Sequence, residues 1–177
     1  DQGFVNPQRV LAVTFTSRAA SEMRERLNQM GVGGVQAQTF HAAARRQLKY
    51  FWPQVAGDLP WQLIDNKFSL VARAVRSLGL DNNKDTIRDF LGEIEWAKSS
   101  LISPEGYPGV IESTDREAPG DPAKVAEVFR RYEDMKATPD LMYLDFDDLL
   151  MHIAGAIENV PAVAEVFREQ YRTFVVD

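Results

Sequence analysis

Apolar and polar positions along the first 51 residues predict two strands and two helices. Arg9–Phe15 (RVLAVTF) is a short, nearly unbroken apolar and β-branched run, as expected of a parallel strand that is buried on both faces. Apolar positions at helical spacing follow over Arg18–Met30, and Val35–Thr39 is the next short strand. Phe40–Phe51 is helical again. Strand, helix, strand and helix in this order predict an α/β layer architecture.

From about Leu59 the pattern changes to helices without strands. The first helix is expected to start at Asp65 or Asn66, and the second at the capping-box spacing of Thr86–Asp89. Pro104–Gly120, which is rich in proline and glycine, is predicted to be a loop. A third helix opens at Asp121, with proline in its first helical position, and runs to about Met135. Residues 59–135 are therefore predicted to form an all-α subdomain.

The α/β pattern returns in the last part of the chain. Asp145–Glu158 is expected to be helical, with three aspartates in its first turn that complement the helix dipole more economically than they would bind a metal. Pro161 starts another helix, and Thr173–Asp177 reads as a strand. The helical segment is thus inserted into an α/β domain made of residues 1–58 and 136–177.

Composition and charge narrow the class of protein. The 177 residues are 45% hydrophobic and 26% charged, which is typical of a globular protein of one or two compact units. The net charge of −6 divides into +4 over residues 1–52 and −10 over the rest, so a polyanion is expected to bind the first third. The chain has no run of 18 apolar residues, no cysteine and two histidines. We therefore expect no membrane span, disulfide or thiolate metal site, in a protein of a reducing compartment.

The first predicted strand is followed by residue types that suit nucleic acid. In parallel sheets ligands gather at the carboxyl ends of the strands. The hydroxyls of Thr14, Thr16 and Ser17, together with Arg18, suit phosphate oxygens, and an exposed Phe15 could stack on a base. The alternative is structural: Thr16 or Ser17 caps the next helix, and Phe15 belongs to the core.

The second strand ends in a comparable way, with Thr39, Phe40 and His41 at its junction with a helix. The two loops are expected side by side on one sheet edge. Taken alone, His41 and His152 favour packing roles, because a single histidine without partners has many structural uses.

Asp177 follows an apolar strand directly. P-loop NTPases place in this position the acid that helps to hold magnesium against nucleotide phosphates. The Gly-Lys-Ser/Thr phosphate loop that would support this interpretation does not occur in the sequence.

Three stretches together resemble a known family. RVLAVTFTSRAASEMRERL is similar to the strand, loop and helix called motif Ia in the UvrD/Rep/PcrA helicases of superfamily 1, and TFHAAARRQL resembles their next motif. YLDFDDLL, followed about 25 residues later by FVVD, is similar to the segment that leads into the magnesium motif of the family. Order and spacing agree, and the resemblance spans essentially the whole chain.

The resemblance implies a partial RecA-like parallel sheet with an inserted all-α subdomain, in an ATP-dependent enzyme that travels 3′-to-5′ on single-stranded DNA during repair or replication. ATP and magnesium would be its cofactors, in the bacterial cytoplasm. The matching positions imply that single-stranded DNA touches these residues: Thr14, Phe15, Thr16, Ser17, Arg18, Thr39, Phe40 and His41. Asp177 would be the catalytic, magnesium-linked acid, and the insertion would contact duplex DNA or a repair protein.

The chain also departs from the family pattern. Ser17 and Arg18 stand where Asn-Lys is usual, and Ala42 replaces a serine. Because the phosphate loop, the Glu after Asp177 and a second motor domain are missing from a chain that also lacks an initiator Met, we expect a piece of a longer protein that neither hydrolyses ATP nor binds it tightly. Two other functions stay open: a non-enzymatic helical interaction module, and a subunit of a helicase-nuclease.

Overall fold

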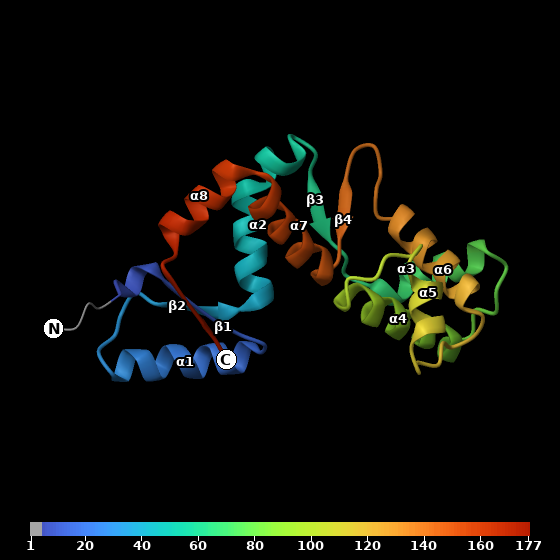
Figure 1. Cartoon of the computed structure of the whole chain (residues 1–177), viewed down its shortest axis with the longest axis horizontal. Coiled ribbons are helices and arrows are strands. Elements are labelled where there is room, and N and C mark those ends of the chain that lie inside the picture. The colour runs from blue at the N-terminus through green and yellow to red at the C-terminus, as the bar shows by residue number, and fades with distance from the viewer. Residues whose placement is uncertain (1–4) are drawn as a thin grey trace. The chain divides into compact units, whose positions relative to one another are not determined.

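The computed structural model describes residues 5–177, which fold into two compact units (Figure 1). The first unit combines Asp1–Asp58 with Asp148–Asp177, and the second is Leu59–Asp147. The chain therefore leaves the first unit once and returns to it.

A parallel three-stranded sheet forms the centre of the first unit. Its strands are β1 (Val10–Thr14), β2 (Gln36–Thr39) and β5 (Thr173–Val176), in the order β2-β1-β5. β1 is the middle strand, and Leu11, Ala12 and Val13 in it are all buried, which explains its unbroken apolar run. The three strands predicted from the sequence are confirmed.

Helices cover both faces of this sheet. On one face Leu11 and Val13 pack with Ala43 of α2 (Phe40–Ala56), and Phe167 of α8 (Pro161–Gln170) packs against the same cluster. On the other face α1 (Ser17–Gln29) lies beside the sheet, as Figure 1 shows. The unit is completed by α7 (Phe146–Asn159), and a short 3-10 helix, η1 (Pro7–Arg9), precedes β1. This arrangement confirms the predicted α/β fold with helices.

The second unit is mostly helical and has its own core. It consists of α3 (Lys67–Ser77), α4 (Lys84–Ser99), α5 (Tyr107–Ser113) and α6 (Pro122–Asp134), with β3 (Trp61–Leu63) paired in parallel with β4 (Met142–Leu144). The helices meet through fully buried side chains that include Val71, Tyr107 and Tyr132. The predicted insertion, residues 59–135, lies within this unit, which extends to Asp147 and therefore also contains β4.

Three details of the sequence prediction for this unit are wrong. The segment after Leu59 contains the β3–β4 pair and is not purely helical. The predicted loop Pro104–Gly120 contains α5, because Tyr107 and Ile111 are drawn into the core. The second helix starts earlier than the predicted capping box: Asn83 is its N-cap, and its side chain accepts from the backbone N–H groups of Asp85 and Thr86. The caps at Asn66 and Asp121 are confirmed.

Asp145 has a role beyond the one predicted from the sequence. It directly precedes α7 and is only 2% exposed. Its carboxylate lies 2.8 Å from Lys98 Nζ and 3.3 Å from Lys136 Nζ, and it accepts a hydrogen bond of 2.9 Å from Tyr132 Oη. The aspartate is thus the centre of a buried ionic cluster in the second unit.

Among residues 5–177, no single helix has the length and composition needed to cross a membrane. α7 and α8 have this length and composition only when they are taken together, and the chain bends by 104° between them.

Candidate nucleic-acid interface

Three strand ends lie next to one another at the carboxyl edge of the sheet in the first unit. Thr14, the last residue of β1, is paired in register with Thr39, the last residue of β2. On the other side of β1 the backbone N–H of Asp177 donates to the carbonyl of Val13 at 3.0 Å. The residues singled out from the sequence, Thr14–Arg18, Thr39–His41 and Asp177, are therefore brought to one edge, which we call the strand-end site.

Two threonines shape this edge by capping helices. Thr16 Oγ1 accepts from the N–H of Ala19 at 3.1 Å and caps α1, while Thr39 Oγ1 accepts from the N–H of Ala42 at 3.1 Å and caps α2. The structural interpretation of Thr16 is confirmed, and Ser17 is the first residue of α1. As cap acceptors, both hydroxyl groups still have a proton to donate to another group.

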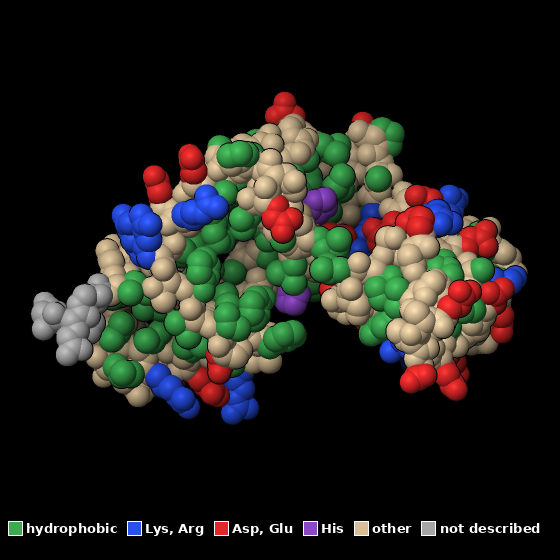
Figure 2. Space-filling model, viewed as in Figure 1, with side chains coloured by type: hydrophobic (Ala, Val, Ile, Leu, Met, Phe, Trp, Pro, Cys, Tyr) green, Lys and Arg blue, Asp and Glu red, His purple; other side chains and the backbone are tan. Residues whose placement is uncertain are grey.

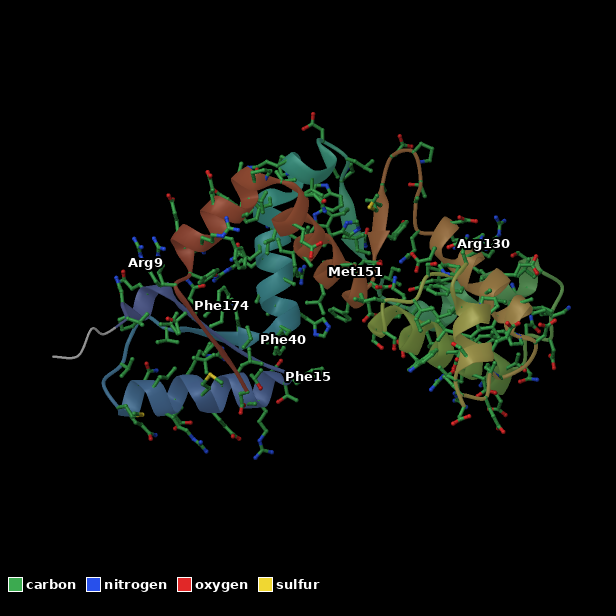
Figure 3. The ribbon with its side chains drawn as sticks, viewed as in Figure 1. Arg9, Phe15, Phe40, Arg130, Met151 and Phe174 are labelled. Atoms are coloured by element: carbon green, nitrogen blue, oxygen red, sulfur yellow. The ribbon has the colours of Figure 1, made fainter. Side chains whose placement is uncertain are left out.

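The aromatic residues of the two loops form a pair at the surface. Phe15 is 76% exposed, so the alternative that placed it in the core is wrong. Its ring centroid lies 6.1 Å from that of Phe40, with an angle of 62° between the planes. Figure 3 shows the two side chains together beyond the ends of β1 and β2. An exposed aromatic ring held in this way presents a face for a planar group to stack on.

The other predicted residues differ in exposure. Thr14 is only 3% exposed, so its side chain is held inside the fold, and His41 is half-buried. Ser17 and Arg18 are exposed, and Arg18 pairs with Glu22 at 2.9 Å one helical turn away. Such a surface pair contributes only about 0.3–0.5 kcal/mol, so an anionic ligand can displace it.

His152 lies apart from the strand-end site, on α7. Its ring packs edge-on against Trp52 of α2, with centroids 5.8 Å apart and an interplanar angle of 81°. This contact agrees with the packing role predicted for it.

Comparison with known proteins identifies the family. The description "UvrD/REP helicase N-terminal domain" matches residues 1–177, which is the whole chain. The chain belongs to the UvrD/REP helicase family. It is 54% identical over 184 aligned residues to the ATP-dependent DNA helicase UvrD2 of Mycobacterium tuberculosis (strain H37Rv), covering 99% of this chain and 26% of UvrD2.

More distant relatives agree. The ATP-dependent DNA helicase PcrA of Leuconostoc citreum is 32% identical over 98% of this chain and 23% of its own length. PcrA of Bacillus subtilis is 29% identical over the same shares. The chain therefore spans about a quarter of the length of these UvrD/REP helicases, and the resemblance predicted from the three sequence motifs is confirmed at the level of the family.

One exposed residue of α2, the helix that follows β2, was not singled out from the sequence. Tyr50 of α2 is 67% exposed, although it adjoins the fully buried Phe51. The helical pattern could have indicated this exposure, because Tyr50 falls outside the stripe of apolar residues that α2 buries.

Proposed function

We propose that this chain is the part of an ATP-dependent DNA helicase that holds single-stranded DNA, and that the strand-end site is where the strand binds. The observation that carries this proposal is the aromatic pair of Phe15 and Phe40, with Phe15 76% exposed beside two capped helix starts. An exposed ring can take up an unpaired base, whereas the bases of a duplex are already stacked. The names of the relatives, all ATP-dependent DNA helicases, support this assignment.

The phosphate groups of the strand would meet donors that surround the aromatic pair. Ser17 and Arg18 are exposed in the first turn of α1, where free backbone N–H groups and the helix dipole favour an anion. The hydroxyl groups of Thr16 and Thr39 and the imidazole of His41 complete the set. Buried Thr14 contributes by fixing the end of β1 and makes no direct contact in this proposal.

Asp177 fits the magnesium role that the family implies. It is exposed directly after β5, and its carboxylate offers the oxygen ligand that magnesium prefers. Magnesium usually keeps several waters and takes one or two carboxylates together with substrate phosphates, so Asp177 would be one of its protein ligands. When bound, the ion would neutralise charge on the phosphates of ATP during hydrolysis.

The remaining parts of the proposal follow from the family. The helicase would act in DNA repair or replication in the bacterial cytoplasm and travel 3′-to-5′ along the strand. The helical unit would contact duplex DNA ahead of the motor or a repair protein.

The test is fluorescence anisotropy of a labelled oligothymidylate with the 177-residue chain and its variants. Loss of one base stack costs about 1–3 kcal/mol, so Phe15→Ala should weaken binding by roughly tenfold or more. His41→Ala should weaken it by a smaller factor. Met30→Ala is the matched control, because Met30 is 75% exposed at the opposite end of α1. Binding that is unchanged in Phe15→Ala and His41→Ala would overturn the assignment.

A further inference from the structure

The solvent side of α2 is unusually basic. The 17 residues of this helix include Arg45, Arg46 and Lys49 and no acidic residue, in a chain whose net charge is −6. At 100° per residue these three cations lie on one side of the helix, with Ala42 before them and Tyr50 at their flank, and all five residues are exposed. We call this set, Ala42, Arg45, Arg46, Lys49 and Tyr50, the basic face of α2.

Two of these cations carry charge that no carboxylate neutralises within residues 5–177. Some exposed arginines on other helices pair with carboxylates, as Arg18 does with Glu22, Arg88 with Asp85 and Arg130 with Glu105, whereas others within residues 5–177, such as Arg168 on α8, do not. Arg45 and Lys49 form no ion pair or hydrogen bond with any residue in the described part of the chain, 5–177. Their charges are therefore available to an external polyanion, which gains from releasing its own counterions.

Arg46 is held in a fixed position at the same face. Its Nη2 donates to Tyr171 Oη at 2.7 Å and to Gln36 Oε1, while Gln47 Nε2 donates to the same phenol oxygen at 2.8 Å. Because these bonds use only Nη2, the Nε and Nη1 groups of the guanidinium keep donors for a phosphate. Arg46, Arg9 and Tyr50 also line a cavity of about 600 Å³, which is within the range that accommodates small ligands.

The basic face continues directly from the strand-end site. α2 is capped by Thr39, the last residue of β2, and Arg46 in the middle of the helix donates a hydrogen bond to Gln36 at the start of the same strand. The helix therefore runs from one edge of the sheet toward the other, over roughly 15 Å between Phe40 and Tyr50 at 1.5 Å per residue. In Figure 3 Phe40 lies at the strand-end edge and Arg9 at the opposite end of β1.

We infer that single-stranded DNA leaving the Phe15–Phe40 pair continues along the basic face of α2, with phosphates on Arg45, Arg46 and Lys49 and a base against Tyr50. The inference rests on the proposed function, because it extends the same strand. The two parts of the track differ in chemistry: the strand-end site holds bases through aromatic rings, and the basic face holds the backbone through charge. The length of the DNA strand and the salt concentration should therefore affect binding at the two parts differently.

The experiment compares oligothymidylates of about four and about twelve nucleotides by fluorescence anisotropy over a range of salt concentrations, since sites of this kind cover roughly 4–16 nucleotides. The double substitution Arg45→Gln, Lys49→Gln should weaken binding of the longer strand by roughly tenfold and reduce its salt slope by about 1.4, at about 0.7 per phosphate contact. Binding of the shorter strand should stay within about twofold of wild type, because the basic face lies beyond its reach. Tyr50→Ala should also weaken only the longer strand.

A second double substitution controls for net charge. Arg168→Gln, Lys124→Gln removes the same charge from exposed positions on α8 and α6 and should leave both strands bound as in wild type. Equal weakening by the two double substitutions, or a longer strand that binds the Arg45/Lys49 variant as tightly as wild type, would overturn the inference. If Phe15→Ala changes neither strand while the Arg45/Lys49 variant still loses the advantage of length, the strand-end assignment fails and the basic face stands as a contact in its own right.

Discussion

The two units of the chain differ in the number and the placement of their charged side chains. The α/β unit has nine basic and nine acidic residues, whereas the helical unit has eleven basic and seventeen acidic residues. In the α/β unit Arg45 and Lys49 are exposed without carboxylate partners, while the helical unit buries Lys98, Lys136 and Asp145 in one ionic cluster. The buried cations of residues 5–177, Lys98 and Lys136, thus both belong to the helical unit.

Apolar surface follows the same division. Of the large apolar side chains exposed in residues 5–177, Leu101 and Phe146 belong to the helical unit and the others to the α/β unit. Three of them are consecutive in β5, where Phe174, Val175 and Val176 are between 46% and 68% exposed. Figure 2 shows hydrophobic side chains gathered over this part of the α/β unit and acidic side chains spread over the helical unit. Within residues 5–177 the helical unit therefore exposes fewer large apolar side chains than the α/β unit does.

The largest effect is expected where the internal pairing of the helical unit is broken. Asp145→Asn removes a carboxylate next to both Lys98 and Lys136, which also pair with Glu133 at 2.8 and 2.6 Å. Breaking a buried ion pair costs about 3 kcal/mol or more, so the free energy of unfolding in urea should fall by that amount. Asp85→Asn removes an exposed pair on α4 and should change it by less than about 0.5 kcal/mol. Equal losses in the two variants would show that the cluster is not what stabilises the unit.

A somewhat smaller effect is expected at the second charge cluster of the helical unit. Arg116 Nε and Nη2 donate to the two carboxylate oxygens of Glu93 at 3.0 and 2.8 Å, Tyr107 Oη donates to the same group at 2.7 Å, and the guanidinium lies 3.9 Å from the Trp96 ring centroid. Arg116→Gln should lower the free energy of unfolding by about 2 kcal/mol at pH 7.

The pH dependence of this variant has a definite sign. Burial alone would raise the pKa of Glu93, but the hydrogen bonds from Arg116 and Tyr107 outweigh it and hold the pKa below its ordinary value of 4.5. In wild type this carboxylate therefore stabilises the fold above about pH 4.5, and its contribution is lost as the pH falls through the lowered pKa. Without Arg116, burial favours the protonated acid, so the penalty should be largest at pH 7 and shrink toward pH 4. A penalty that is constant over this range would contradict the role given to Glu93.

Local patterns in the sequence predicted the strands of the α/β unit well, and for a physical reason. β1 is buried on both faces, so four of its five residues, Val10–Val13, are apolar, and the cap of the helix that follows can be predicted from neighbouring residues. β3 and β4 could not be found in this way. Each has three residues, and their pairing joins Trp61 to Met142 across the whole helical unit. α5 contains proline and glycine and is helical because the core takes up Tyr107 and Ile111.

The candidate site shows the same limit. The residue types of Thr14–Arg18 and Thr39–His41 follow from the sequence, and parallel pairing of β1 with β2 brings them together. The exposure of these side chains does not follow from the sequence. The local pattern around Phe15 fits a core residue as well as a surface residue. Asp145 is a further case: three acids near a helix start suggest a dipole effect, whereas its lysine partners lie nine and 47 positions away along the chain.

The smallest effect that we expect is a gain in stability on replacing Leu101. This residue is the most exposed of the large apolar side chains in the helical unit. Leu101 follows α4 with φ of 58° and is 77% exposed. The N–H of Leu101 donates to the carbonyl of Lys98 at 3.0 Å, and that of Ile102 to Ala97 at 2.8 Å, a helix ending in which glycine is the favoured residue. Leu101→Gly relieves strain of about 1–2 kcal/mol but gives the unfolded chain more freedom, so we expect a net gain of about 0.5–1 kcal/mol in the free energy of unfolding.

Leu101→Ala is the matched control, because it shortens the side chain and keeps the strained φ. If the exposed leucine stabilises nothing within the unit, the alanine variant should unfold within about 0.5 kcal/mol of wild type, as surface substitutions usually do. A loss of stability in both variants would mean that the leucine side chain packs in solution. The helical unit would then be self-contained even at this position, and its contrast with the α/β unit would be sharper than the exposed surfaces indicate.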